Sequence, residues 1–164
     1  MKEELRRQRN AERLLELYPT FRVRLKRVIA ALEADGFRPR IQDAWRSPDD
    51  QMKAFLSGHS KLKFGFHNVT APSGAKESLA VDLLDDDSPL ASRKKYLLRL
   101  AAAAEQHGLT TGIRWGVPAA LRGAIDTAIA TKDWEAKVKI GWDPTHVEPT
   151  GITPGEAKAG TRPD

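Results

Sequence analysis

Three residues that lie far apart in the sequence have the types that bind a metal ion: His67, Asp82 and His146. Two histidines and an aspartate can supply three protein ligands to zinc and leave the fourth tetrahedral position open for water, whereas a structural zinc site closes all four. Asp143 precedes His146 in the run W-D-P-T-H-V-E, so a carboxylate would lie close to whatever His146 binds. Because metal-assisted hydrolysis needs a base beside the activated water, the pattern indicates a catalytic zinc centre.

Each of these residues also has a purely structural interpretation. His67 and His146 have aromatic neighbours, a setting in which a histidine is more often a satisfied core residue than a ligand. Asp82 lies in the apolar run L-A-V-D-L-L, where a carboxylate is costly unless it is paired or metal-bound. Its partner could be Arg46 or Arg114 instead of a metal. The metal hypothesis therefore depends on the three residues taken together.

The other histidines and the aspartate run do not indicate a second metal site. His59 lies in a polar segment, and His107 precedes Gly108 at a predicted helix end, where a histidine suits the helix dipole. Residues 85–87 are three aspartates, but they lack the spacing of an EF-hand calcium loop. We expect a solvated turn there.

The composition restricts the class of protein. The chain has 164 residues, of which 40% are hydrophobic and 30% charged, which is typical of one folded domain. It has no cysteine, so any zinc ligands must be nitrogen and oxygen atoms. The net charge of +5 comes largely from the first 30 residues, which form either a solvated helix face or a surface for anionic polymers. No zinc-finger or RNP-type motif and no 18-residue apolar run occurs, so we expect neither sequence-specific nucleic-acid binding nor a membrane span.

The spacing of apolar residues predicts alternating helices and strands. Ser47 and Pro48 are typical of an N-cap and a first turn, and Pro72-Ser73-Gly74 indicates a turn at a hairpin tip. Helices are predicted over residues 2–16, 21–36, 47–56, 89–107 and 119–130, and strands over 38–45, 79–84, 109–115 and around His146 and Val147.

These elements predict an α+β fold with a small, mostly antiparallel sheet and helices packed around it. Residues 1–150 are expected to form a single domain, with residues 1–36 as its helical N-terminal part. Residues 151–164 are rich in glycine and proline and poor in large apolar side chains, so we expect a frayed tail there.

The order of several short motifs adds a family resemblance. The motifs are A-W-R-S-P-D-D-Q, S-G, G-F-H-N, L-A-V-D-L, W-G and W-D-P-T-H-V-E, spread over roughly residues 40–150. In this order they resemble the zinc D-Ala-D-Ala carboxypeptidase family, especially its VanY-like members and the L-alanyl-D-glutamate endopeptidases of phage endolysins. That family has an arginine followed by serine or threonine and a glutamine, then S-x-H-x-x-G-x-A-x-D, and finally a carboxylate three residues before a histidine.

The resemblance implies a role for each matching residue. The zinc ligands would be His67, Asp82 and His146. Asp143 would be the general base, in a place that many relatives give to glutamate, and Arg46 would hold a substrate carbonyl or carboxylate and stabilise the oxyanion. Gln51 aligns with the glutamine of the family and would support Arg46 or the wall of the site. Glu148 is either a neighbour of the ligands or a surface residue.

The resemblance also implies a function and a hedgehog/DD-peptidase-like fold. We expect a monomeric zinc peptidase that cleaves stem-peptide or crosslink amides of peptidoglycan, as a phage endolysin with L-alanyl-D-glutamate or D,D-endopeptidase activity. The alternatives are a D,D-carboxypeptidase or dipeptidase that acts on wall precursors, and a non-catalytic wall-binding module that uses the basic N-terminal helices. The N-terminal run M-K-E-E-L-R-R-Q-R-N lacks the apolar core of a secretory signal, so we expect synthesis in the host or bacterial cytoplasm and action on the wall after release.

The spacing of the first two ligands departs from the family pattern. Asp82 follows His67 by 15 positions, whereas the pattern places the aspartate seven positions after the histidine. A hairpin over residues 68–78 can absorb such an insertion, because loop length raises the closure cost only slowly. Gly65 replaces the serine of the pattern, and Ser78-Leu79 replaces its glycine. The departures therefore concern the substrate-facing loop more than the metal ligands.

Overall fold

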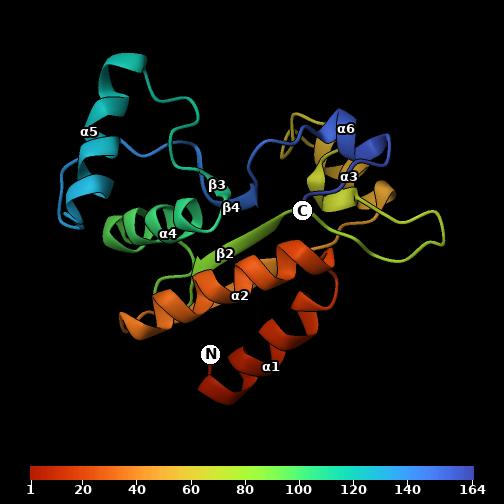
Figure 1. Ribbon diagram of the computed structural model, residues 1–164, viewed down its shortest axis with the longest axis horizontal. Coiled ribbons are helices and arrows are strands. Elements are labelled where there is room, and N and C mark those ends of the chain that lie inside the picture. The colour runs from red at the N-terminus through yellow and green to blue at the C-terminus, as the bar shows by residue number, and fades with distance from the viewer.

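The structure, a computed structural model, describes residues 1–164 and has one antiparallel four-stranded sheet with helices around it (Figure 1). The strand order is β1-β2-β4-β3, which confirms the predicted α+β class. The strands are β1 (Pro39–Asp43), β2 (Val81–Asp85), β3 (Leu109–Gly112) and β4 (Asp143–Pro149). The helices are α1 (Glu3–Leu14), α2 (Pro19–Ala34), α3 (Pro48–Leu56), α4 (Lys94–Gln106), α5 (Ala119–Thr131) and α6 (Pro154–Lys158), with a short 3₁₀ helix, η1 (Phe66–Asn68). None of the helices has the length and apolar character needed to cross a membrane.

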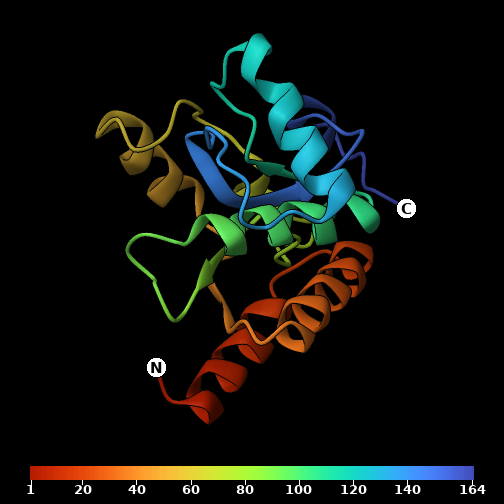
Figure 2. The same cartoon turned by 90° about the vertical axis from the view of Figure 1, so that its left-hand side faces the viewer.

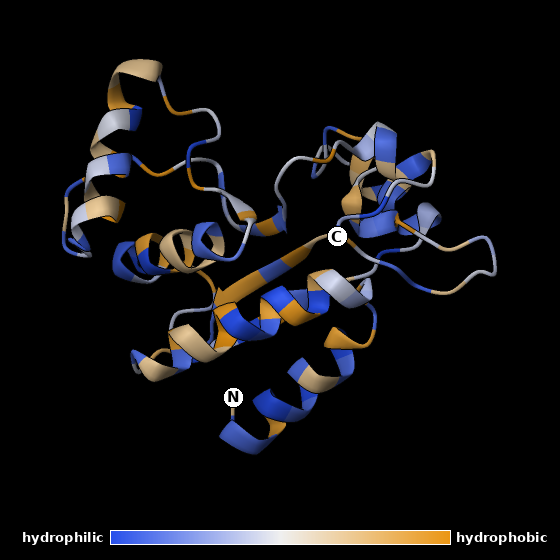
Figure 3. Cartoon of the chain, viewed as in Figure 1, coloured by the Kyte–Doolittle hydropathy of each residue, from blue (hydrophilic) through white to orange (hydrophobic).

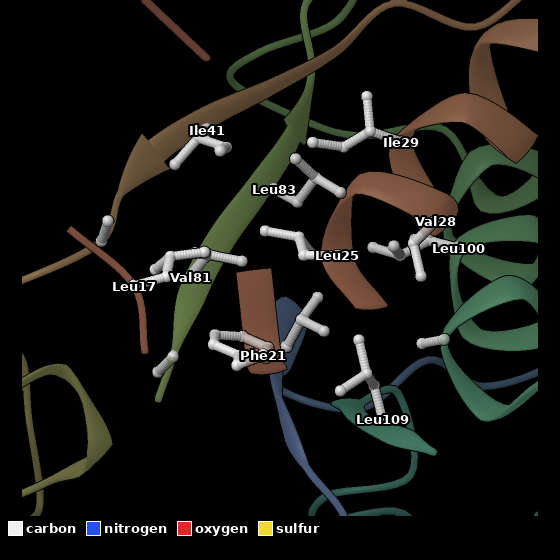
Figure 4. Packing of buried hydrophobic residues seen from close by; sticks show 14 of the residues in the cluster. Leu17, Phe21, Leu25, Val28, Ile29, Ile41, Val81, Leu83, Leu100 and Leu109 are labelled. Carbon is white, nitrogen blue, oxygen red and sulfur yellow. The ribbon is translucent and has the colours of Figure 1, made fainter. Parts of the chain in front are cut away.

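The main core lies between the sheet and helices α2 and α4. In α2, Phe21, Leu25 and Val28 recur at helical spacing and are fully buried. They pack with Ile41 of β1 and Leu83 of β2 (Figure 4). Burial of each such side chain is worth roughly 1.5–3 kcal/mol. The hydropathy of α2 alternates around the helix, and most of β2 is apolar (Figure 3).

The alternation of side chains in β2 and β4 places polar residues on the face of the sheet opposite this core. Val81 and Leu83 are buried in β2, so the intervening Asp82 points to the other face. Val147 is buried in β4, and His146 precedes it. In the antiparallel pairing of the two strands, Asp82 lies directly opposite His146. Side chains at such paired positions lie about 4.5–5.5 Å apart at Cβ, so the register itself brings a carboxylate and an imidazole together.

The C-terminal residues are packed against the domain, so the prediction of a frayed tail is wrong. Thr153 and Glu156 form a reciprocal capping box at the start of α6, and Ala157 is 2% exposed in the main core. Arg162 forms an ion pair with Glu77 at 3.1 Å. The glycine and proline content concealed this helix, although the T-P-G-E run contains a capping-box signal.

The three aspartates at the end of β2, residues 85–87, are also not a solvated turn, because two of them are buried. Asp85 is fully buried and pairs with Arg93 at 2.7 Å, and Asp86 pairs with Arg40 at 2.7 Å. The predicted helix over residues 89–107 also begins later than expected. Its first residue is Lys94, because the backbone of Arg93 before it is extended. The arginine partners come from other segments of the chain, and the local run of aspartates therefore gave no indication of them.

Candidate metal centre

The structure brings the three predicted metal ligands together on the open face of the sheet. Asp82 and His146 come from paired positions of β2 and β4, and His67 comes from η1. The Nε2 atom of His67 lies 3.7 Å from one carboxylate oxygen of Asp82, and the Nδ1 atom of His146 lies 3.7 Å from the other. One donor atom from each of the three residues lies within 4.8 Å of the other two.

The remaining nitrogen of each imidazole is held by an acceptor. The Nδ1 atom of His67 lies 2.6 Å from the carbonyl oxygen of Ala44, which can only accept, so Nδ1 donates and the Nε2 lone pair faces Asp82. The Nε2 atom of His146 lies 3.1 Å from Oε1 of Glu148, which leaves Nδ1 free toward Asp82. Such partners fix the tautomer and ring orientation of metal-binding histidines.

The charges of the cluster depend on one another. Burial opposes ionisation of Asp82, but the contact with His146 and the charge of His67 outweigh it, so the pKa of Asp82 lies below its usual 3.8. Burial lowers the pKa of His67. Burial acts in the same direction on His146, but Asp82 and Glu148 outweigh it and raise the pKa of His146 to about 9. The ionised carboxylate between the two rings is therefore balanced either by a proton or by a cation.

The donor set fits zinc. Two imidazole nitrogens and one carboxylate oxygen are ordinary zinc ligands, and three protein ligands leave the fourth position for a reacting molecule. Nε2 of His67 and Nδ1 of His146 each lie 3.7 Å from an oxygen of Asp82, and a cation held between them would take the place of the proton on His146.

Asp143 lies beside this cluster at the start of β4. Its Oδ2 atom is 3.8 Å from Nδ1 of His146, and its side chain is about one-third exposed (32%). Burial raises the pKa of Asp143 above 3.8, although the charge of His146 acts against this. The opposing residue in β3 is Gly112, where a Cβ would lie 2.0 Å from the backbone oxygen of Asp143. The missing side chain at Gly112 therefore permits the close approach that positions Asp143.

Arg46 and Gln51 form one hydrogen-bonded unit next to His67. The backbone N–H of Arg46 donates to the carbonyl of His67 at 2.8 Å, and its guanidinium donates to Gln51 at 2.9 Å and to Asp43 at 2.5 Å. Gln51 is 2% exposed and its amide also donates to Ser60 and to the carbonyl of Leu62. Gln51 thus connects Arg46 to the segment around Ser60 and Leu62. Asp43, which ends β1 and opposes Asp82 across the sheet, was not among the residues predicted for the site.

The alternative partners for Asp82 are used elsewhere. Arg114 pairs with Glu105 and Asp126, and Arg46 pairs with Asp43. Both histidines that were predicted to lie outside the site do so: His59 is exposed, and His107 is the C-cap residue of α4.

An aromatic wall extends outward from His146. The ring of Trp115 lies 5.2 Å from the ring of His146, and the ring of Trp142 lies 5.5 Å from that of Trp115. Gly116 has a φ of +76°, and a Cβ there would lie 3.0 Å from Trp142. Gly116 therefore supplies both the left-handed turn and the space that Trp142 occupies.

Comparison with known proteins gives a structural match but no sequence match. No family model matches the sequence, and no curated protein matches it. The chain is similar to the L-Ala D-Glu endopeptidase ChiX of Serratia marcescens, with 20% identity, coverage of 87% of this chain and 86% of that chain, and a TM-score of 0.53. Two further similar structures are the LdcB LD-carboxypeptidase (16% identity, 88% and 72% coverage, TM-score 0.47) and the VanY D,D-pentapeptidase in complex with Zn(II) (15% identity, 85% and 74% coverage, TM-score 0.43). The similarity to ChiX shows that this chain has the fold of that endopeptidase, which confirms the fold that the motif order implied.

Proposed function

We propose that this chain is a zinc-dependent peptidase that hydrolyses amide bonds in the stem peptides or crosslinks of peptidoglycan. The observation that carries the proposal is the pair of imidazoles, each held by an acceptor at one nitrogen and facing Asp82 with the other. The half-buried Asp143 beside them supplies the base that hydrolysis requires. The fold, which the chain shares with an L-Ala D-Glu endopeptidase, supports the choice of substrate class.

The residues of the site have separate roles in this proposal. His67, Asp82 and His146 would hold the zinc ion, which when bound would acidify water toward a pKa of about 7 and polarise a carbonyl. The Oδ2 atom of Asp143 takes the proton of the water that attacks the amide carbonyl, and returns it to the amine nitrogen as the C–N bond breaks.

Arg46 holds the carbonyl oxygen or a carboxylate of the substrate, and its guanidinium is oriented by Asp43 and Gln51. Loss of one such oxyanion stabiliser typically lowers the rate about 10²–10³-fold. Glu148 keeps His146 in the tautomer that leaves Nδ1 free.

The more specific assignment is an endopeptidase of the phage endolysin kind, acting as a monomer on L-alanyl-D-glutamate or D,D bonds after release from the cell in which it is made. The motif order supports the endolysin assignment, and the fold shared with ChiX, an L-Ala D-Glu endopeptidase, supports the choice of an endopeptidase.

Digestion of purified peptidoglycan, with and without a chelator, followed by mass analysis of the fragments, tests the proposal. An endopeptidase releases soluble muropeptide fragments, stops on chelation and recovers with zinc. A D,D-carboxypeptidase releases D-alanine alone and leaves the wall insoluble. A wall-binding module releases nothing, and its binding survives chelation but weakens with salt, an outcome that would refute the proposed hydrolysis.

A further inference from the structure

The segment that follows α3 forms a positively charged arm beside the metal centre. We call residues 57–65 the lysine arm, and Figure 2 shows α3 and this segment projecting away from the helices that cover the core. From Gln51 to Lys76 the sequence contains four lysines and no aspartate or glutamate. Lys53 is the only one of the four with an ion-pair partner, Asp50, at 4.0 Å. The two lysines of the arm therefore have no acidic residue that neutralises their charge.

One of these lysines lies over the aromatic wall of the site. The Nζ atom of Lys61 lies 5.1 Å from the ring centroid of Trp142, whose side chain is unusually exposed for a tryptophan, at 60%. An indole ring attracts an ammonium group without forming an ion pair with it, so this contact draws Lys61 toward the aromatic wall and leaves its ammonium group available to an anion. The rings of Trp142, Trp115 and His146 follow one another at 5.5 and 5.2 Å. A continuous aromatic surface therefore connects Lys61 to a metal ligand.

The arm is tied to the rest of the site on both sides of Lys61. The buried amide of Gln51 donates to the hydroxyl of Ser60 at 2.8 Å and to the carbonyl of Leu62 at 2.7 Å. The carbonyl oxygen of the same Gln51 side chain accepts from Arg46. One buried residue therefore sets the position of Lys61 relative to Arg46, which is the second cation of the site.

We infer that Lys61 and Trp142 form a subsite for a substrate carboxylate. The ammonium group supplies charge-assisted donors to the carboxylate, and the indole face packs against the aliphatic part of the residue that bears it. The inference rests on the proposed peptidase function and deepens it: the preferred substrate is a stem peptide with a free carboxylate, not a carboxamide, near the scissile bond. Because Lys61 is exposed, the preference is modest, about fivefold.

The test compares two peptides and four proteins. The peptides are L-Ala-γ-D-Glu-L-Lys and the same peptide with D-isoglutamine in place of D-glutamate. The proteins are the intact zinc-loaded wild type, Lys61→Gln, Lys61→Arg and Lys63→Gln. Lys63 is the matched control, because it is an exposed lysine of the same arm but lies over Phe55, at 5.4 Å.

The wild type, Lys61→Arg and Lys63→Gln should favour the carboxylate peptide about fivefold in kcat/KM, through KM, and Lys61→Gln should reduce the ratio to about one. Equal kcat/KM values of the wild type for the two peptides would overturn the inference. An equal fall of the peptide ratio in Lys61→Gln and Lys63→Gln would also overturn it. Calorimetric Kd values for both peptides, measured on Asp143→Asn, should show the same ratio without any turnover. If the zinc-loaded wild type binds the two peptides with this ratio but cleaves neither of them, the proposed peptidase function is refuted and the subsite is retained.

Discussion

Glu148 should control zinc affinity although it is not a ligand. Its carboxylate lies 3.1 Å from Nε2 of His146, and its side chain is 16% exposed, so little water can replace it. In Glu148→Ala the ring of His146 loses the acceptor that fixes both its tautomer and its orientation. Loss of such a partner typically lowers metal affinity about 10–100-fold.

The structure narrows the expected loss of zinc affinity in Glu148→Ala. The equivalent nitrogen of His67 is held by the backbone carbonyl of Ala44, which no side-chain substitution removes. Only one of the two imidazoles is loosened in Glu148→Ala, so we expect the lower part of the range, about 10–30-fold, or about 1.4–2 kcal/mol. Glu148→Gln keeps an oxygen that can accept from Nε2, and it should lose less than about tenfold.

Zinc affinity is measured by competition with a fluorescent chelator on the intact protein. Glu77→Ala is the matched control, because Glu77 is a comparably buried carboxylate (22% exposed) that pairs with Arg162 and not with the metal ligands. This control should keep the wild-type Kd. If Glu148→Ala binds zinc with a Kd within twofold of the wild-type value, the proposal that Glu148 orients the ring of His146 is wrong. It is equally wrong if the loss matches that of His146→Ala, which removes a ligand and should abolish binding.

The remaining predictions concern the base, the sheet and acid stability. Asp143→Asn should keep zinc and lose about 10²–10⁴-fold in kcat, and retained wall lysis would exclude Asp143 as the base. Gly112→Ala should lower the urea midpoint, because its Cβ would lie 2.0 Å from a backbone oxygen, whereas Gly123→Ala, in open space on α5, should raise stability by about 0.5–1 kcal/mol. The guanidinium groups of Arg6 and Arg38 lower the pKa of Glu3 from 4.5 to about 2, so this contribution to stability is present above pH 4.5 and is lost as the pH falls from 4.5 through 2. The difference in Tm between the wild type and Glu3→Gln should shrink over that range, and a difference as large at pH 2 as at pH 7 would exclude this cause.

Much of the fold was predictable because local patterns decide it. Phe21, Leu25 and Val28 repeat at helical spacing, and each is fully buried on one face of α2. The short apolar run that contains Val81 and Leu83 likewise predicted β2 as a buried strand. In these segments the residues that pack together are close in sequence, so the local pattern of apolar residues is sufficient to predict the helix or strand.

Contacts between distant segments were not predictable in the same way. Asp43 is only three residues from Arg46, but it lies at the site because β1 ends there and pairs with Asp82 of β2, and nothing in the local sequence distinguishes it from a surface aspartate. The burial of Asp85 depends on Arg93, and that of Asp86 depends on Arg40 of another strand. A carboxylate can be buried where an arginine reaches it, and the run of three aspartates does not indicate which arginine that is.

The long separation between His67 and Asp82 shows why sequence spacing is a weak constraint on such a site. The extra residues form a hairpin that closes on itself, with Thr70 bridged to Lys76 and the amide of Glu77 donating to the carbonyl of Val69 at 3.0 Å. Beyond the hairpin, the amide of Leu79 donates to the carbonyl of Phe66 at 2.9 Å, so the chain returns beside η1 before β2 begins. The distance between the two ligands is therefore set by this return and by the register of the sheet. Residues added to the hairpin would increase the closure cost only slowly and would leave the ligands in place.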